Sequence, residues 1–286
     1  MRVRVIRSLL YVPANSERFI EKAHERGADA IILDLEDGVP PSEKDKAREN
    51  LDKAVATVRR GGAYVFVRIN SGEDRRGCDA EAACRAGAFG LLVPKVQTAE
   101  SLRRLALKLE PVEQELAREP VRFIALIEDP GAVLDARLIA MASPRVLGLA
   151  AGGEDLATAM DAEPASEAIR LAILMVHMAA KAADVRSFGL LRSIADFRDL
   201  AGVAASARQA RAMGFDGASC VHPAVVPILN EAFAPSAAQL DHARRLIAAF
   251  ESASAEGRGA FRFEGVMVDL PIYERALKLV SRADKP

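Results

Sequence analysis

Short apolar runs alternate with longer segments rich in Ala, Arg and Glu, and this alternation constrains the fold more than any other feature. The runs are rich in β-branched residues, as strands are, and the segments between them are long enough for helices. Eight strands are predicted at residues 8–12, 30–35, 64–69, 90–93, 122–127, 146–149, 185–188 and 217–221. Helices are predicted between them at 16–26, 42–60, 99–109, 131–142, 165–183 and 196–213. Eight such units predict a (β/α)8 TIM barrel, in the α/β class.

The composition supports this fold class. Half of the 286 residues are hydrophobic, but only 5% are aromatic and Trp is absent. The interior must therefore be built from Ala, Val, Leu and Ile, as it is in proteins that cover parallel strands with helices. We predict that residues 1–235 form the catalytic barrel and that residues 236–286 form a helical C-terminal extension with a linker at 252–259. The segment after this linker is too short to fold alone, so it should pack on the barrel or on a neighbouring subunit.

Charge and cysteine content exclude several classes of protein. The net charge is −1 and the basic residues are spread along the chain, which argues against nucleic acid and anionic membranes as partners. Three cysteines without a Cys-x-x-Cys spacing fit neither a disulfide framework nor a zinc site. No segment reaches the length needed to cross a bilayer. We expect a soluble protein of the reducing cytoplasm.

Charged residues follow several of the predicted strands, where barrels of this kind carry their catalytic side chains. Glu36 and Asp37 follow the second strand, Arg68 lies in the third, Glu128 follows the fifth and Asp155 follows the sixth. Carboxylates gathered from three strand ends would repel one another unless a cation lay among them. The available ligands are oxygens and the four histidines are scattered, so the sequence predicts Mg²⁺ and argues against zinc.

Each acid alone has a structural alternative. Asp129 precedes Pro130 as a helix N-cap does, and Glu154 or Asp155 could cap the following helix. The metal prediction therefore depends on the whole set. Lys95 would suit a Schiff-base aldolase, but such a lysine needs desolvation or a cationic neighbour, whereas acids surround this position. An ion pair is the favoured interpretation of Lys95.

Several phrases of the sequence resemble one family. They are RSLLYVPANSERFIEKA, GADAIILDLEDGV, VRIN, LLVPKV, ALIED, GGEDLA, GFDGASCVHPAVV and GVMVDLPIYERA, and they cover nearly the whole chain in order. The sequence resembles the citrate lyase β subunit-like (CitE-like) branch of the HpcH/HpaI aldolase superfamily. This resemblance implies a magnesium-dependent enzyme that makes or breaks a carbon–carbon bond between an acyl-CoA and a small 2-keto acid. It also implies a homotrimer or a multiple of trimers.

The resemblance assigns roles to the residues at the rim of the barrel that the carboxyl ends of the strands form. It implies that Glu128 and Asp155 bind the metal, with Glu128 also at the substrate. Arg68 would hold the carboxylate of the keto acid, and Glu36 and Asp37 would orient metal-bound water.

The resemblance also gives a role to Asp269, which precedes a proline-started helix after the predicted linker. It implies that Asp269 lies over the active site of a neighbouring subunit and serves there as general acid or base. The structural alternative is a carboxylate resting at a helix N-terminus. The chain departs from the family at Asp129, where Thr is frequent, and at residues 184–197, which lack an acidic, proline-rich phrase.

The leading expectation is a stand-alone lyase that cleaves (S)-citramalyl-CoA or malyl-CoA into acetyl-CoA and pyruvate or glyoxylate. A malate synthase or malyl-CoA thioesterase would share the metal and the enolate. A citrate lyase subunit would instead act on a citryl thioester of a carrier protein. A noncatalytic subunit is disfavoured because the set of acids and arginine has no gap.

Overall fold

The computed structural model describes residues 3–283, which divide into two compact units. The first unit is Ile6–Phe233. The second combines the residues before Ile6 with those from Ala234 onward.

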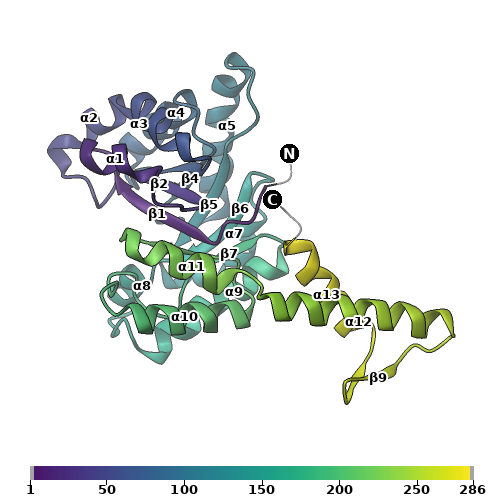
Figure 1. The fold of residues 1–286 in the computed structure, drawn as a ribbon. Coiled ribbons are helices and arrows are strands. Elements are labelled where there is room, and N and C mark those ends of the chain that lie inside the picture. Colours follow the sequence, from purple (N-terminus) through teal and green to yellow (C-terminus); the bar gives the residue numbers. More distant parts are fainter. Residues whose placement is uncertain (1–2, 284–286) are drawn as a thin grey trace. The chain divides into compact units, whose positions relative to one another are not determined.

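An eight-stranded parallel sheet forms the centre of the first unit, and helices surround it (Figure 1). Its strands are β1 (Ser8–Pro13), β2 (Ala30–Asp34), β3 (Tyr64–Arg68), β4 (Gly90–Val93), β5 (Arg122–Ile127), β6 (Val146–Ala151), β7 (Arg186–Phe188) and β8 (Ala218–Cys220). β1 pairs with both β2 and β8, and a parallel bridge between Phe188 and Gly217 joins the two ends of the sheet. The predicted (β/α)8 barrel is confirmed.

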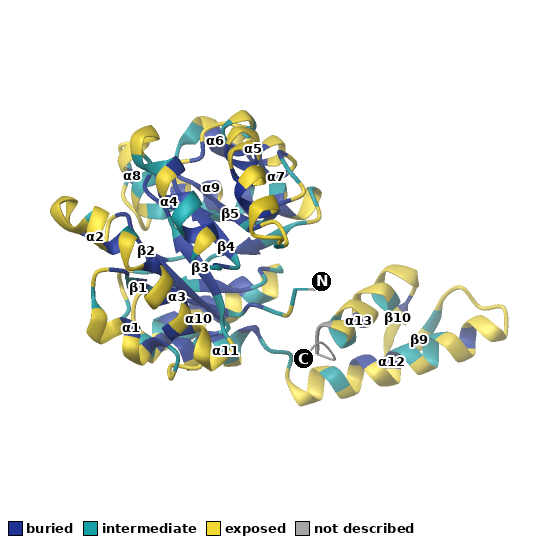
Figure 2. Ribbon diagram, turned by 90° about the horizontal axis from the view of Figure 1, so that it is seen from above, coloured by how far each residue is buried: buried dark blue, intermediate teal, exposed yellow. Residues whose placement is uncertain are grey.

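The strands form where the sequence supplies apolar runs that can be buried on both faces. β2 and β4 are buried along their whole length, as expected for parallel strands covered by helices. Figure 2 shows this buried core in dark blue at the centre of the barrel. Gly90 leaves room for an aromatic ring, because a Cβ atom there would lie 2.6 Å from Cε1 of the fully buried Phe66.

The helices of the barrel unit follow the strands. They are α1 (Glu17–Ala23), α2 (Lys44–Glu49), α3 (Leu51–Val58), α4 (Glu73–Arg85), α5 (Ala99–Glu115), α6 (Pro130–Leu134), α7 (Ala136–Ala140), α8 (Gly153–Ala159), α9 (Glu167–Ala182), α10 (Leu200–Met213) and α11 (Val226–Phe233). Thr98, Ser166 and Asp199 cap α5, α9 and α10 by accepting backbone N–H bonds. The single helix predicted at 42–60 is wrong, since the chain breaks at Asn50 into α2 and α3. Across residues 3–283, no helix has both the length and the apolar character that crossing a membrane requires.

The second unit contains α12 (Ala237–Ala255), a hairpin of β9 (Phe261–Phe263) and β10 (Val266–Val268), and α13 (Leu270–Ala283). Ser236 and Gln239 form a capping box at the start of α12. Phe250 of α12 stacks on Tyr273 of α13, with ring centroids 4.3 Å apart. The predicted C-terminal helices are present, but the predicted linker at 252–259 is wrong in its first half, because α12 continues to Ala255.

His177 of α9 is a buried titratable group of the barrel. Its Nε2 lies 3.1 Å from the carbonyl oxygen of Met213, and its Nδ1 lies 2.9 Å from Oγ of Ser187. A carbonyl only accepts, so Nε2 carries the proton of the neutral ring. Burial lowers the pKa of His177 below its ordinary value of 6.5. At this histidine the unfolded chain therefore binds more protons than the folded chain around and below pH 6.5, so the contribution of His177 to stability falls as the pH falls through this range.

We expect the free energy of unfolding in urea of the parent, relative to that of His177→Gln, to decrease between about pH 7.5 and about pH 5.5, because only the parent carries this group. The measurement is denaturation followed by circular dichroism at several pH values. His242→Gln, at an exposed position on α12, is the matched control. If His177→Gln kept the full slope of the parent, His177 would not be its source.

Candidate active site

Arg68 and Asp34 form a bidentate ion pair at the carboxyl ends of β2 and β3. The two residues are register partners in neighbouring strands. Arg68 donates from Nε to Oδ1 of Asp34 at 2.6 Å and from Nη2 to Oδ2 at 2.7 Å. Asp34 also accepts the backbone N–H groups of Glu36 and Gly38, each at 2.9 Å. The sequence predicts that the acids after this strand meet a cation but singles out only Glu36 and Asp37 as site residues, whereas it is Asp34 that holds both Arg68 and the turn that carries Glu36.

The other side of the Arg68 guanidinium faces the two remaining acids of this turn. Its Nη1 lies 3.3 Å from Oε2 of Glu36 and 3.1 Å from Oδ2 of Asp37. The guanidinium carbon also lies 5.0 Å from the ring centroid of Tyr11. Burial alone would lower the pKa of Arg68, but its bonds to Asp34 and the neighbouring acids outweigh burial and raise it. The structure thus brings together Arg68, Glu36 and Asp37, as predicted.

Glu36 has a buried side-chain oxygen that accepts no hydrogen bond from the described residues. Its side chain is nearly inaccessible, and within residues 3–283 its Oε1 has no hydrogen-bond partner. Burial raises the pKa of Glu36 to about 7, Arg68 opposes this shift, and the charges of Asp37 and Glu128 add to it. A buried oxygen without a donor is costly unless a ligand or water supplies one. This part of the rim is therefore suited to bind a donor that the protein itself does not provide.

Glu128, directly after β5, lies beside Asp155 in the first turn of α8. Oε2 of Glu128 accepts the backbone N–H of Lys95 at 2.6 Å, and a Cβ atom at Gly152 would lie 2.5 Å from Cγ of Glu128. The site therefore needs glycine at position 152. Burial raises the pKa of Glu128, the Lys95 N–H bond lowers it, and the charge of Asp155 raises it further.

Lys95 contacts both of these acids. Its backbone has a φ of 50°, in the left-handed region, and its N–H points at Glu128. Its Nζ lies 3.8 Å from Oδ1 of Asp155. The predicted ion pair of Lys95 is confirmed.

The oxygens of Glu128 and Asp155 are the groups best suited to hold a magnesium ion. Within residues 3–283, no three His, Cys, Asp or Glu side chains gather closely enough to hold an ion by themselves. An ion here would take two carboxylates from the protein and its other ligands from water or substrate, which is the usual coordination of Mg²⁺. The open Oε1 of Glu36 would suit a hydrogen bond from such a water. The donor set fits the metal, and the ligand assignment stays a prediction.

Helix capping, the structural alternative for these acids, applies to Asp129 but not to Glu154 or Asp155. Asp129 is an N-cap, because its Oδ1 accepts the N–H groups of Gly131 at 2.8 Å and Ala132 at 3.2 Å. The cap of α8 is Gly152, and neither Glu154 nor Asp155 makes a side-chain capping bond there. Asp155 is therefore not occupied by capping.

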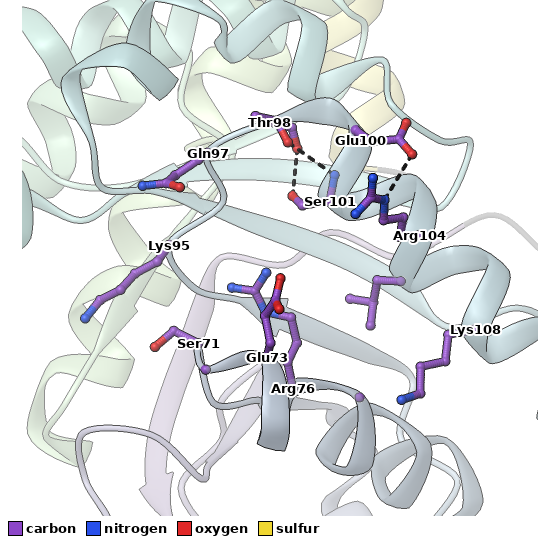
Figure 3. Close-up of a pocket in the computed structure, with 13 residues that line it drawn as sticks. Ser71, Glu73, Arg76, Lys95, Gln97, Thr98, Glu100, Ser101, Arg104 and Lys108 are labelled. Carbon is purple, nitrogen blue, oxygen red and sulfur yellow. Dashed lines mark hydrogen bonds and ion pairs between the residues drawn. The ribbon is translucent and has the colours of Figure 1, made fainter.

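A cleft of about 700 Å³ borders the site between α4 and α5 (Figure 3). Ser71 and Lys95 line it, and Lys95 also contacts Glu128 and Asp155. Arg104 and Lys108 reach it from α5. Its basic residues are Arg76, Lys95, Arg104 and Lys108. Glu73 and Glu100 are its acidic residues, so cations outnumber anions in this cleft.

Asp269 lies in the second unit, just before α13. Its Oδ1 accepts the backbone N–H of Ile272 at 3.4 Å, which is the contact expected of an acid at a helix N-terminus. A role for Asp269 at the active site of a neighbouring subunit stays a prediction.

Comparisons with known proteins identify the family of the chain. A sequence model described as HpcH/HpaI aldolase/citrate lyase matches residues 7–223. This range holds all the candidate residues of the rim but not Asp269. The citrate lyase subunit beta of Escherichia coli K12 is 33% identical over 99% of this chain and 95% of its own. A (3S)-malyl-CoA thioesterase of Cereibacter sphaeroides is 36% identical over 92% of this chain and 89% of its own.

A solved structure is similar along the whole length. Protein CitE of Mycobacterium tuberculosis, in complex with magnesium, acetoacetate and coenzyme A, superposes with a TM-score of 0.79. The two sequences are 31% identical, and the match covers 99% of each chain. The chain therefore belongs to the HpcH/HpaI aldolase/citrate lyase family and, within it, to the citrate lyase β subunit-like branch of carbon–carbon lyases that act on CoA thioesters.

Proposed function

We propose that the protein is a magnesium-dependent lyase that cleaves (S)-citramalyl-CoA or malyl-CoA into acetyl-CoA and pyruvate or glyoxylate. The observation that carries this proposal is the arrangement of Arg68 beside Glu36, close to the neighbouring carboxylates of Glu128 and Asp155. The similar CitE structure holds magnesium, a keto acid and coenzyme A, which supports the same class of ligands here. A cytoplasmic location and an assembly of trimers belong to the proposal.

The reaction requires a base, a cation that polarises the substrate oxygen, and a group that binds the substrate carboxylate. A base takes the proton of the 3-hydroxyl group, the bond between C2 and C3 breaks, and its electron pair forms the enolate of the acetyl thioester; a proton delivered to C2 of this enolate then gives acetyl-CoA. Magnesium at Glu128 and Asp155 would polarise the substrate oxygen and help to bind the adjacent carboxylate. Arg68 would hold that carboxylate with the donors that Asp34 does not use, and its Nη1 would then exchange its bond to Asp37 for one to the substrate. Glu36, with a pKa of about 7, would hold water or a proton near neutral pH.

A second function uses the same groups. The (3S)-malyl-CoA thioesterase that is 36% identical to this chain makes thioester hydrolysis a specific alternative. The citrate lyase subunits among the relatives make a carrier-protein thioester another. The rim residues serve all three reactions, so the products must separate them.

The test is to incubate the protein and Mg²⁺ with malyl-, citramalyl-, β-methylmalyl- and citryl-CoA and to identify the products by mass. Acetyl-CoA with pyruvate or glyoxylate would support the proposal. Free CoA with the intact hydroxy acid would establish a thioesterase instead. Inactivity with every CoA ester, together with cleavage of a citryl carrier protein, would establish a citrate lyase subunit.

Arg68→Lys is expected to lower kcat/KM for cleavage more than about a hundredfold, because lysine keeps the charge but loses the planar fork. It should also lower the free energy of unfolding by about 1–3 kcal/mol, since one of the two bonds to Asp34 is lost. Steady-state kinetics and urea denaturation measure the two effects.

Arg85→Lys is the matched control. Arg85 also makes a bidentate pair, with Glu115, but on the exposed surface of α4. The Arg85→Lys variant should leave the rate of cleavage unchanged. Near-normal kinetics for Arg68→Lys would remove Arg68 from the site.

A further inference from the structure

Lys44, the first residue of α2, turns its ammonium onto the strand end that carries Glu36. Its Nζ donates to the carbonyl oxygen of Leu35 at 3.1 Å, to that of Glu36 at 2.7 Å, and to Oδ1 of Asn70. An ammonium has three donors, and each has an acceptor here. Lys44 therefore bonds the backbone next to the candidate site rather than any substrate position.

A buried network fixes the position of Asn70. Its backbone N–H and its Nδ2 both donate to Oδ2 of Asp79, at 2.9 and 2.7 Å. Asp79 is fully buried in α4, and its Oδ1 accepts from Nη1 of Arg48 at 3.2 Å. Because Asp79 holds the amide nitrogen, the amide oxygen of Asn70 must point at Lys44. The network thus ties two helices, α2 and α4, to the ends of β2 and β3.

The turn after β2 is consequently held from two sides. Asp34 accepts its N–H groups, at Glu36 and Gly38. Lys44 donates to its carbonyl groups, at Leu35 and Glu36. Asp34 fixes one side of the backbone and Lys44 fixes the other, and the direction in which Glu36 projects toward Arg68 depends on both.

We infer that Lys44 is a positioning residue: through the carbonyls of Leu35 and Glu36, and braced by Asn70 and Asp79, it sets the carboxylate of Glu36 against Arg68. The effect on turnover rests on the proposed function, whereas the effect on the turn does not. Lys44 touches no reacting atom. Its loss should misplace Glu36 by a small distance, and displacements of about 1 Å can cost roughly a hundredfold in rate.

Two measurements on Lys44→Met test this inference. Methionine keeps most of the length of the side chain and removes its three donors. Hydrogen exchange followed by mass spectrometry should show faster exchange in peptides that cover residues 35–39, with the strands of the barrel unchanged. In the cleavage assay, kcat should fall by about tenfold to a hundredfold while KM changes less than about threefold. Lys44→Arg, which keeps charge and donors, should recover part of both losses.

Lys46→Met is the matched control, since Lys46 is exposed on the same helix. It should leave both exchange and kcat at parental values. Unchanged exchange at residues 35–39 in folded Lys44→Met would overturn the inference, as would the same increase in Lys46→Met. If the parent protein cleaves no thioester, the proposed function fails, and the exchange experiment still decides the role of Lys44.

Discussion

Glu128→Gln and Asp155→Asn are each expected to abolish magnesium binding and cleavage while the barrel stays folded. Each change replaces one carboxylate by an amide of the same shape, so it removes a charged ligand without opening a cavity. Since the protein supplies two carboxylates at this point, neither can compensate for the other. We expect the affinity for Mg²⁺ to fall more than about a hundredfold. This loss is larger than the one usual for residues that only hydrogen-bond a metal ligand. Isothermal calorimetry measures this affinity without any substrate.

Thermal unfolding gives an independent readout. Burial raises the pKa of Glu128, so its charged form is disfavoured in the folded protein and costs stability near neutral pH in the absence of a cation. Glu128→Gln should therefore unfold at the same or a higher temperature than the parent without Mg²⁺. Adding Mg²⁺ should raise the midpoint of the parent but not that of the variant.

Glu154→Gln is the control, because Glu154 is exposed beside Asp155 and makes no capping bond. It should bind Mg²⁺ as the parent does. If Glu128→Gln or Asp155→Asn also bound Mg²⁺ with parental affinity, that residue would not be a ligand.

The barrel could be predicted from the sequence because most strands are apolar runs and several of them end at charged residues. β5 and β4 begin and end where the pattern placed them. Helix α4 was missed, since its sequence is strongly charged and its buried face includes Gly77 and Asp79. The limits of α12 were also misjudged, because Ser, Ala and Gly after residue 251 resemble a linker although the helix continues to Ala255.

The candidate site could be predicted only in part, because topology can be inferred from the sequence but strand register cannot. Barrel topology brings strand ends together, and this was enough to group Arg68 with Glu36 and Asp37. The pairing of Asp34 with Arg68 depends on the register between β2 and β3, and spacing along one chain does not reveal that register. One signal was available: Asp34 ends a run as apolar as a buried strand, and a buried carboxylate requires a cation nearby.

Lys44 and Asp79 gave no such signal. Lys44 lies among other charged residues in EKDKARE, and Asp79 lies in the charged sequence of α4. Their contacts join α2 and α4 to two strand ends. A network that spans four elements becomes visible only when those elements are packed, so the residues that position Glu36 emerged from the structure.

Asp269→Asn and Asp155→Asn are each expected to be nearly inactive alone, but to recover activity when they are unfolded and refolded together. The resemblance to the family supports the proposal that Asp269 acts as general acid or base in the active site of a neighbouring subunit. Asn also caps helices well, so Asp269→Asn should keep α13 in place. In a mixed trimer, a site is intact when its rim comes from the Asp269→Asn chain and its tail from the Asp155→Asn chain.

For equal amounts of the two chains and random assembly, about a quarter of the sites would be intact, so the mixture should reach about a quarter of parental activity. The matched control is a mixture of Asp155→Asn with Glu128→Gln. Both of these changes lie in the rim of the same barrel, so no arrangement of subunits restores a site and the mixture should stay inactive. Native mass spectrometry must show that mixed oligomers form in both cases. If the Asp269→Asn mixture stays inactive although mixed oligomers are present, Asp269 acts within its own chain or takes no part in the reaction. A recovery in both mixtures would instead mean that the two rim acids do not belong to one site.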